Sequence, residues 1–415
     1  MSETMAPVDT AWLHMEDPAD PMTVVAVLWF AVAPPWGEVI ARFEERVVRR
    51  FPRFRQRAVE RRLGRPVWVD DPLFSIQAHV HRIALPPPHD SGALQRLIGD
   101  LAGTPLDLRF APWSLSLVDG FGAGGAMVVR IHHCVADGLA LSEVLLGLTD
   151  GASLEHVQTV RVAPEPRGRR YPARAYGAAL AKLLLSAPDA RTALKGELGL
   201  VKRVAWSVPM PLSAIRERGR VEHATVNDVV MAAVAGALRR WLLTHHHEPV
   251  DVRAFVPVDL RRGDQPALEL GNRFGLVYLQ LPVAEPDARL RLRASHQRMA
   301  AIKHSPEASV AFGILHAMGR APAALERAAL PVFGAKGTLV LTHVRGPTKS
   351  VHICGHEVDG LMFWVPQAGR LGVGVSVLSY AGMVRVGVYT DAGIIEDPSQ
   401  LVAAVEREIA TPLTA

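Results

Sequence analysis

The stretch HHCVADG, residues 132–138, decides how the rest of this chain is interpreted. The apolar run 126–133 is typical of a strand, and a helix is predicted from about Gly138 onward. Successive side chains of a strand point to opposite faces, so His132 and His133 cannot both face the same cavity. The stretch therefore predicts one catalytic and one structural histidine at the point where a strand gives way to a helix.

Histidine is suited to removing the proton of an alcohol, because its ordinary pKa of about 6.5 leaves the neutral ring available at working pH. Asp137 lies at the predicted helix start, where a carboxylate can cap backbone N–H groups or hold a neighbouring cation. Gly138 then leaves room for a close approach of backbone. Cys134 is disfavoured as a nucleophile, since adjacent strand residues point apart.

Length and composition predict an ordinary globular protein of two domains. The chain has 415 residues, which exceeds the length at which a single hydrophobic core usually stops growing. Of these residues, 49% are hydrophobic and 21% are charged. Its two cysteines, Cys134 and Cys354, are too few for a disulfide framework and favour a reducing compartment. The N-terminus lacks the pattern of a signal peptide, and the apolar run 22–32 is shorter than the ~20 residues of a membrane-spanning helix. We therefore expect a cytoplasmic protein in which this run is a buried strand.

Strands and helices alternate in both halves of the chain, which predicts two α/β units. We place the N-terminal subdomain, with the HHxxxDG pattern, at 1–155 and the C-terminal subdomain at 201–415. Between them, 156–200 is predicted to hold a linker and a bridging helix, because 151–175 is polar, arginine-rich and punctuated by prolines. The helix predicted at 175–185 could instead cover a tunnel or touch a membrane.

Two clusters of residues suggest other partners, and neither is specific. Ten arginines lie within 42–65, but Glu44, Glu45 and Glu60 interrupt them and no recognition motif accompanies them, so no nucleic-acid partner is predicted. Anionic lipid headgroups or the phosphates of a cofactor fit this cluster better. The histidines 245–247 would need further ligands to bind a metal ion and are predicted to form a solvated turn, so no metal site is expected.

Several motifs resemble those of the bacterial wax ester synthase/diacylglycerol acyltransferase family, within the superfamily of chloramphenicol acetyltransferase and peptide-synthetase condensation domains. The HHCVADG stretch matches the active-site motif of this family at every fixed position. The other matching segments are PVDTAWLHMED (7–17), PLDLRFAPWSLSLVDG (105–120), ATVNDVVMAAVAGALRRWL (224–242), FVPVDLR with GNRFG (255–275) and LTHVRGP (341–347).

The resemblance implies two chloramphenicol-acetyltransferase-like α/β subdomains with an active-site tunnel between them. It implies that His133 is the general base and that Asp137 orients its loop through an arginine, which the sequence does not identify. The other site residues that it implies are His132 and Gly138, which shape the catalytic loop, and Asn227 and Asp228, which contribute substrate-binding groups from the second subdomain.

The function implied is acyl-CoA-dependent O-acyl transfer to a long-chain alcohol or diacylglycerol, as in wax ester and triacylglycerol synthesis. Transfer would be direct, with donors near the tunnel centre stabilising the oxyanion, acyl-CoA as co-substrate and no cofactor. The alternatives are a carrier-protein donor, a smaller alcohol, or a non-catalytic protein of lipid surfaces. Attachment to the periphery of a membrane or lipid droplet is a further expectation.

Two departures from the family pattern bear on substrate choice rather than on reaction type. Where the family usually has Asn-Val-Pro-Gly-Pro, residues 343–347 read His-Val-Arg-Gly-Pro. Where it has Pro-Leu-Trp, residues 111–113 read Ala-Pro-Trp.

Overall fold

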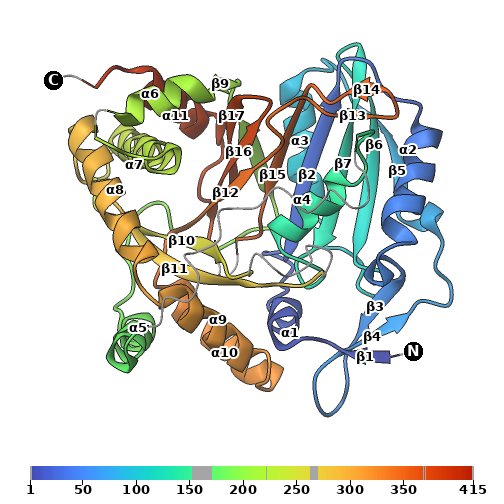
Figure 1. Ribbon diagram of the computed structural model, residues 1–415, viewed down its shortest axis with the longest axis horizontal. Coiled ribbons are helices and arrows are strands. Elements are labelled where there is room, and N and C mark those ends of the chain that lie inside the picture. Colours follow the sequence, from blue (N-terminus) through green and yellow to red (C-terminus); the bar gives the residue numbers. More distant parts are fainter. Residues whose placement is uncertain are drawn as a thin grey trace.

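Two open β-sheets, one centred in each half of the chain, stand side by side in the computed structural model (Figure 1). The structure describes residues 2–151, 171–220, 222–261, 270–367, 369 and 371–413. Most of the linker predicted between the halves, 152–170, therefore lies outside the described residues.

The first sheet carries the HHCVADG stretch at the end of its central strand. Its strands are, in order, β15 (Gly360–Trp364), β2 (Thr23–Phe30), β7 (Gly124–His132), β6 (Trp113–Phe121) and β5 (Val80–Ala84). Every residue of β7 is buried, as the apolar run predicts, and α4 (Gly138–Leu146) begins directly after the motif. The predicted order of strand, motif and helix is confirmed.

Helices cover the first sheet, and a small sheet extends from its lower end. The helices are α2 (Trp36–Phe43), which a π-helical turn continues to Val48, and α3 (Ser91–Gly103). The strands of the small sheet are β1 (Ser2–Thr4), β4 (Val67–Asp70) and β3 (Gln56–Val59). Gly64 lies at the tip of the β3–β4 hairpin, where its φ is +90°.

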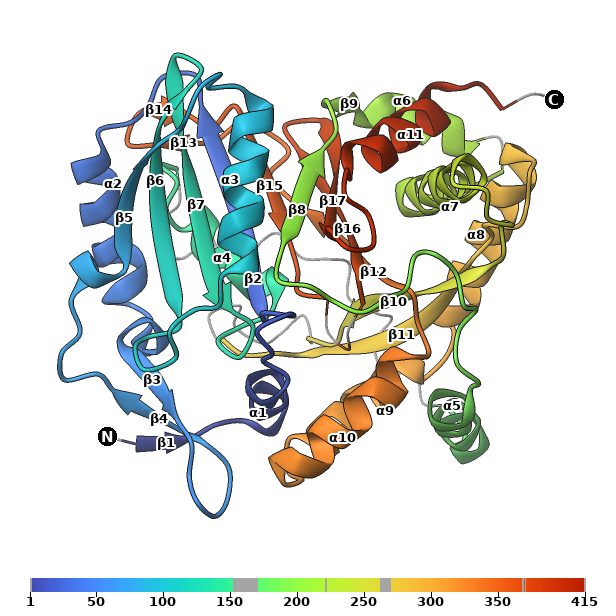
Figure 2. The ribbon, with the colours of Figure 1, turned by 180° about the vertical axis from the view of Figure 1, so that it is seen from behind.

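The second sheet is mixed, and helices cover the face that points away from the first sheet (Figure 2). Its strands are β11 (Phe274–Leu281), β10 (Val252–Asp259), β12 (Leu339–Arg345), β16 (Val373–Tyr380), β17 (Met383–Asp391) and β8 (Lys202–Trp206), with β9 (Met210–Pro211) paired to β17. The covering helices are α6 (Leu212–Arg220), α7 (Val226–Thr244), α8 (Ala288–Lys303) and α11 (Ser399–Ala410). Helix α7 is largely buried, because its apolar side chains lie on all sides of the helix.

The two halves are joined by more than a linker. Strand β15 belongs to the predicted C-terminal subdomain, 201–415, yet it pairs with β2 in the first sheet. Helix α3 of the first half packs against β8 of the second. A Cβ added at Gly99 would lie 2.7 Å from the carbonyl oxygen of Lys202, and one added at Gly103 would lie 2.7 Å from that of Leu200. The small residues of α3 thus allow close contact between the halves, and a boundary placed by composition does not capture this exchange.

Three helices were not predicted from the sequence pattern: α1 (Pro7–His14), α6 and α10 (Ala323–Gly334). Helix α1 has only 8 residues and no side-chain cap, and α10 contains Pro331, which normally ends a helix. Helix α9 (Glu307–Met318) packs against α1.

Helix α5 (Ala173–Leu185) confirms the helix predicted at 175–185 but not its bridging position. It lies at the lower edge of the molecule and packs chiefly on α9 (Figure 1). Lys182 pairs with Glu307 of α9 at 2.7 Å, and only Ala179 and Leu183 of α5 are buried. Among the described residues, no helix is long and apolar enough to cross a membrane.

Candidate active site

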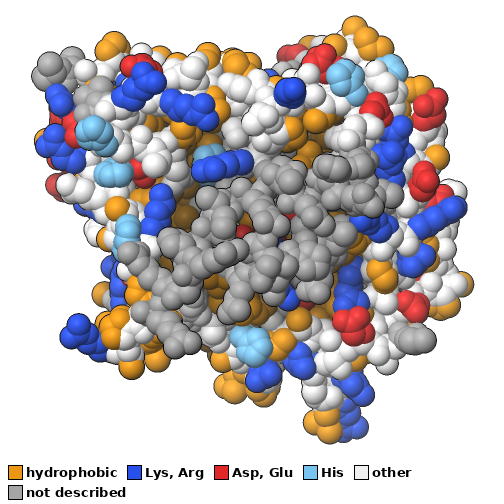
Figure 3. Space-filling view, in the orientation of Figure 1, with side chains coloured by type: hydrophobic (Ala, Val, Ile, Leu, Met, Phe, Trp, Pro, Cys, Tyr) orange, Lys and Arg blue, Asp and Glu red, His pale blue; other side chains and the backbone are white. Residues whose placement is uncertain are grey.

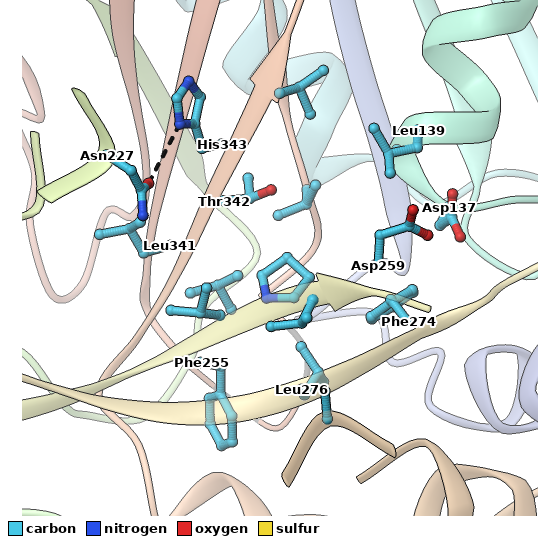
Figure 4. Close-up of a pocket in the computed structure, with 18 of the residues that line it drawn as sticks. Asp137, Leu139, Asn227, Phe255, Asp259, Phe274, Leu276, Leu341, Thr342 and His343 are labelled. Atoms are coloured by element: carbon cyan, nitrogen blue, oxygen red, sulfur yellow. Dashed lines mark hydrogen bonds between the residues drawn. The ribbon is translucent and has the colours of Figure 1, made fainter. Parts of the chain in front are cut away.

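A cavity of about 790 Å³ lies between the two halves of the chain. Its walls include His133, Asp137 and Gly138 from the first half and Asn227 and His343 from the second. Figure 4 shows the catalytic loop on one side, Asn227 and His343 on the opposite side, and strands β10 and β11 crossing below. The cavity therefore brings together motif residues about 90 or more positions apart in the sequence.

His133 is buried against aromatic rings. The indole of Trp12 in α1 stacks on its imidazole with ring centroids 3.9 Å apart, and the ring of Phe274 in β11 is 5.7 Å away. This burial lowers the pKa of His133 to about 4, although the nearby charge of Asp137 opposes the shift. The imidazole is therefore neutral at neutral pH, which is the form that can accept a proton.

Asn272 fixes the backbone of His133 from the other half of the chain. Its Nδ2 donates to the carbonyl oxygen of His133 and to Oδ1 of Asp9, each at 2.8 Å, and its backbone N donates to the same Asp9 oxygen at 3.1 Å. Burial raises the pKa of Asp9 to about 7, although the hydrogen bonds from Asn272 oppose this. Helix α1 and the loop before β11 thus hold the base between them.

His132 points away from the cavity, as the alternation of strand side chains predicts. Its Nε2 lies 3.2 Å from Oε2 of Glu16, and its Nδ1 accepts a hydrogen bond from the backbone N of Cys134 at 3.1 Å. Cys134 is fully buried, does not line the cavity, and burial raises the pKa of its thiol well above the usual range. Neither residue is placed to contact a substrate in the cavity.

Asp137 performs both roles that its position suggests. Its Oδ1 accepts from the backbone N of Ala140 at 3.1 Å and so caps α4. Its Oδ2 accepts from Arg261 at 2.7 Å and from the backbone N of Arg273 at 3.0 Å. The arginine partner that the sequence left open is therefore Arg261, which also contacts Asp259 at 3.1 Å.

Gly138 differs from the expectation of close backbone contact. A Cβ added at this position meets no atom within 4 Å, and the residue lines the cavity. The missing side chain therefore leaves space for a ligand next to His133 rather than space for neighbouring backbone.

The Asn-Asp pair at the start of α7 divides between the cavity and the helix. Asn227 lines the cavity, where its Oδ1 is 3.3 Å from Nδ1 of His343. Asp228 does not line it: its carboxylate forms a capping box with Thr225 and contacts Nδ1 of His296 at 2.9 Å. Asp228 thus places Asn227 by fixing the helix start.

The cavity has an apolar region and a cationic region. Arg216 of α6 and Arg345 of β12 line the cationic region, are exposed, and form no ion pair with any described residue. The loops around them are joined, because Leu212 donates to Gly382 and Ala381 donates to Pro347. The apolar region lies against α1, α9 and α10 and is lined by Met15, Leu276, Leu315, Met318, Leu330 and Phe333.

In the described part of the chain, no three His, Cys, Asp or Glu side chains are grouped so that they could hold a metal ion. Histidines 245–247 form an exposed turn after α7, as predicted, and His245 stacks on Trp241 with ring centroids 4.1 Å apart.

Sequence reasoning assigned no role to several residues around His133. Trp12 and Asp9 lie in the PVDTAWLHMED segment, and Asn272 lies in GNRFG. The similarity of these segments to family motifs was the available signal, but their contact with His133 depends on folding across more than 100 positions. Arg261 was hidden in the same way among many arginines.

Comparisons with known proteins agree with this geometry. The family profile of the wax ester synthase/diacylglycerol acyltransferase catalytic domain matches residues 5–233, and that of the WS/DGAT C-terminal domain matches residues 270–411. A probable diacylglycerol O-acyltransferase of Mycobacterium tuberculosis is 29% identical over 379 residues, covering 84% of this chain and 81% of the relative. A second, putative one from the same species is 28% identical over 441 residues, covering 95% and 87%.

Solved structures show the same fold. The wax ester synthase/diacylglycerol acyltransferase from Marinobacter aquaeolei VT8 is similar with a TM-score of 0.73 and 22% identity over 98% of both chains. The first condensation domain of the calcium-dependent antibiotic synthetase is similar with a TM-score of 0.66 and 17% identity, covering 100% of this chain and 98% of that domain. With two family profiles covering most of its length, the chain belongs to the wax ester synthase/diacylglycerol acyltransferase family and is an acyltransferase.

Proposed function

We propose that this acyltransferase moves an acyl group directly from acyl-CoA to a long-chain alcohol or diacylglycerol, with His133 as general base. The observation that carries the proposal is the neutral, buried imidazole of His133 on the wall of the cavity between the two halves. A base in this state can take the proton of a hydroxyl group bound in the same cavity.

In the proposed reaction, His133 takes up one proton from the alcohol and later gives the same proton to the leaving group. The imidazole removes the hydroxyl proton of the alcohol, and the alcohol oxygen forms a bond to the thioester carbonyl carbon. The tetrahedral oxyanion then collapses, the C–S bond breaks, and the imidazolium returns its proton to the departing thiolate. The backbone N–H groups of Gly138 and Leu139, the first two of α4, have no carbonyl partner within the helix, and both residues line the cavity, so these groups would stabilise an oxyanion next to the base.

Direct transfer is favoured over an acyl-enzyme because no nucleophile is paired with the base. Nδ1 of His133 is buried and has no hydrogen-bond partner among the described residues. The adjacent thiol of Cys134 is buried away from the cavity with a raised pKa, so its reactive thiolate is disfavoured. A covalent route would lack the activated nucleophile that it requires.

The two regions of the cavity support an assignment of substrate parts. The apolar side chains around α9 and α10 suit hydrocarbon chains, and the unpaired cations Arg216 and Arg345 suit the phosphates of CoA. A thiol-release assay of acyl-CoAs against a panel of alcohols tests the whole proposal. Absence of CoA release with every alcohol would contradict it.

The cationic region gives a first prediction about the donor. Arg216→Ala and Arg345→Ala are each expected to raise the KM for acyl-CoA about threefold to tenfold, since each removes an exposed contact to phosphate. Steady-state assays should show no such rise with an acyl thioester that carries no phosphate. Arg220→Ala is the matched control, because Arg220 lies on the same helix, is paired with Glu217 and does not line the cavity.

The same measurement separates CoA from a carrier protein as donor. If the physiological donor is a carrier, the arginine variants should weaken use of the acyl-carrier while leaving the KM for acyl-CoA unchanged. Equal KM values for acyl-CoA in all three variants and the wild type would contradict the proposed phosphate contacts.

We further propose that the protein docks on a membrane or lipid-droplet surface, facing the cytoplasm, through its lower edge. In Figures 1 and 2 this edge carries the β3–β4 hairpin, α5 and α10. Leu63 at the hairpin tip is 87% exposed and follows the exposed Arg61 and Arg62, and Figure 3 shows blue and orange side chains together on this projection. Further exposed apolar side chains of the edge are Tyr176, Leu180, Leu184 and Leu185 of α5 and Leu325 and Val332 of α10.

The docking prediction is tested with vesicles that contain anionic lipid. The triple change of Leu63, Leu184 and Leu185 to serine is expected to reduce vesicle binding about tenfold or more, because exposed leucines then no longer enter the bilayer. Flotation of the variant and of the wild type gives the ratio. Leu290→Ser in α8 is the control, since Leu290 is 46% exposed but lies away from this edge. Failure of the wild type to float with anionic vesicles would contradict docking.

A further inference from the structure

His343 and Asn227 form a polar pair that the proposed proton transfer does not use. His343 lies on β12, Asn227 lies in the first turn of α7, and both line the cavity. Oδ1 of Asn227 is 3.3 Å from Nδ1 of His343. Figure 4 shows the pair on the wall opposite Asp137, with the second ring nitrogen pointing away from Asn227.

The partners of Asn227 determine which ring nitrogen of His343 carries hydrogen. An amide oxygen can only accept, so the contact with Oδ1 requires hydrogen on Nδ1 of His343. The amide Nδ2 of Asn227 instead donates to Sδ of Met231 at 3.6 Å, which supports this orientation of the amide. Nε2 of His343 is then a hydrogen-bond acceptor.

The ring of His343 stays neutral in this setting. Burial, together with a smaller effect of the neighbouring charge of Arg345, lowers its pKa to about 4. Nε2 is buried and has no hydrogen-bond partner among the described residues. A buried acceptor without a partner is unfavourable, and on the wall of a substrate cavity a ligand can supply the missing hydrogen.

The position of His343 places it along the path of the donor. Arg345 follows two residues later on the same face of β12, and it belongs to the cationic region. A donor with its thioester at His133 and its phosphates near Arg345 would pass His343 with the amide-containing arm that joins the two. Amide N–H groups are donors that match a neutral Nε2.

We propose that His343, positioned by Asn227, is a specificity-determining residue that accepts a hydrogen bond from a substrate N–H or O–H group away from the reacting atoms. The hydrogen comes from an amide of the pantetheine arm of the donor or from a second hydroxyl group of the alcohol. This inference rests on the proposed function and adds a residue for substrate recognition to it.

Two substitutions separate the roles of the ring nitrogens. His343→Asn keeps an amide that can donate to Asn227 in place of Nδ1 but has no atom near the position of Nε2. His343→Gln can place its amide oxygen, an acceptor, near that position. His343→Leu removes both nitrogens and provides a second loss variant, so the test does not depend on one protein. Thermal unfolding checks that each variant is folded.

KM values are measured with two donors and two alcohols. The donors are acyl-CoA and an acyl thioester of a plain alkanethiol, which has no amide, and the alcohols are a long-chain alcohol and the matched 1,2-diol. His343→Asn and His343→Leu are expected to raise one KM about threefold to tenfold, and His343→Gln to stay within about twofold of wild type. A rise for acyl-CoA that is absent with the alkanethiol ester identifies the pantetheine amide. A rise for the diol alone identifies the second hydroxyl group.

The proposal is overturned if the asparagine and leucine variants match the wild type with all four substrates, or if glutamine behaves like leucine. Failure of the proposed function is a distinct result, because the wild type itself would then release no thiol with any alcohol. In that case calorimetric binding of acyl-CoA and of the 1,2-diol to the wild type and to His343→Asn still tests the acceptor Nε2, and equal affinities of the two proteins for both ligands would overturn the proposal.

Discussion

Replacing His133 by alanine is expected to lower kcat by about 10²- to 10⁴-fold, the usual contribution of a positioned general base. The residual rate reflects substrate positioning and oxyanion stabilisation, which do not depend on the imidazole. Thiol release under saturating acyl-CoA measures the effect. Because acyl-CoA is bound mainly by other parts of the cavity, its affinity in a calorimetric titration should change little.

His133→Gln provides the control for space. It fills more of the volume beside Trp12 than alanine does but cannot take a proton, so it should be as inactive as alanine and more stable to heat. Turnover near the wild-type level in either folded variant would show that another group is the base.

The pH dependence of the wild type adds a second measurement on the same residue. Since the pKa of His133 is lowered from its ordinary value to about 4, the base is already neutral at pH 6 and becomes protonated only as pH falls toward 4. The kcat/KM profile should therefore show no inflection near 6.5 and should decline only at lower pH. Burial raises the pKa of Asp9 and of Glu143 in α4 to about 7, and Asp9→Asn would remove an inflection that belongs to Asp9 but not one that belongs to Glu143.

The strands, the α7 helix and the opposed directions of His132 and His133 follow from local patterns, and the structure confirms them. Periodicity in the side chains records which face of an element is buried, so it predicts elements well. This periodicity carries no information about which elements, distant in sequence, pack or pair with one another. For this reason β15 was placed in the second half although it pairs with β2 in the first sheet.

The surroundings of His133 show the same limit at the level of the site. The motif identifies the base, but its pKa depends on Trp12 and on burial that only the folded chain creates. Asn272 supports the backbone of His133, and Arg261 is the charge partner of Asp137. These two residues lie on either side of residues 262–269, far from the motif in sequence. Residue types alone cannot select these two from other asparagines and arginines.

The contact between Asp137 and Arg261 leads to the second large expected effect. Asp137→Ala removes the cap of α4 and leaves Arg261, whose side chain is only 18% exposed, without its closest carboxylate. Breaking a largely buried ion pair in this way costs about 3–5 kcal/mol, and loss of the cap alone costs about 0.5–2 kcal/mol. We therefore expect a clear fall in Tm, measured by calorimetry, together with a kcat reduced about tenfold or more, since this loop carries His133.

A double-mutant cycle separates the free energy of the contact between Asp137 and Arg261 from the other effects that each substitution has on stability. Arg261→Ala alone should also destabilise the protein, but the double variant should be less unstable than the sum, with a coupling of about 0.5–3 kcal/mol. Asp259→Ala is the matched control, because Asp259 contacts the same arginine at 3.1 Å rather than 2.7 Å and caps no helix. Additive effects of Asp137→Ala and Arg261→Ala would show that the two side chains stabilise the loop independently, and that the position of His133 does not depend on their contact.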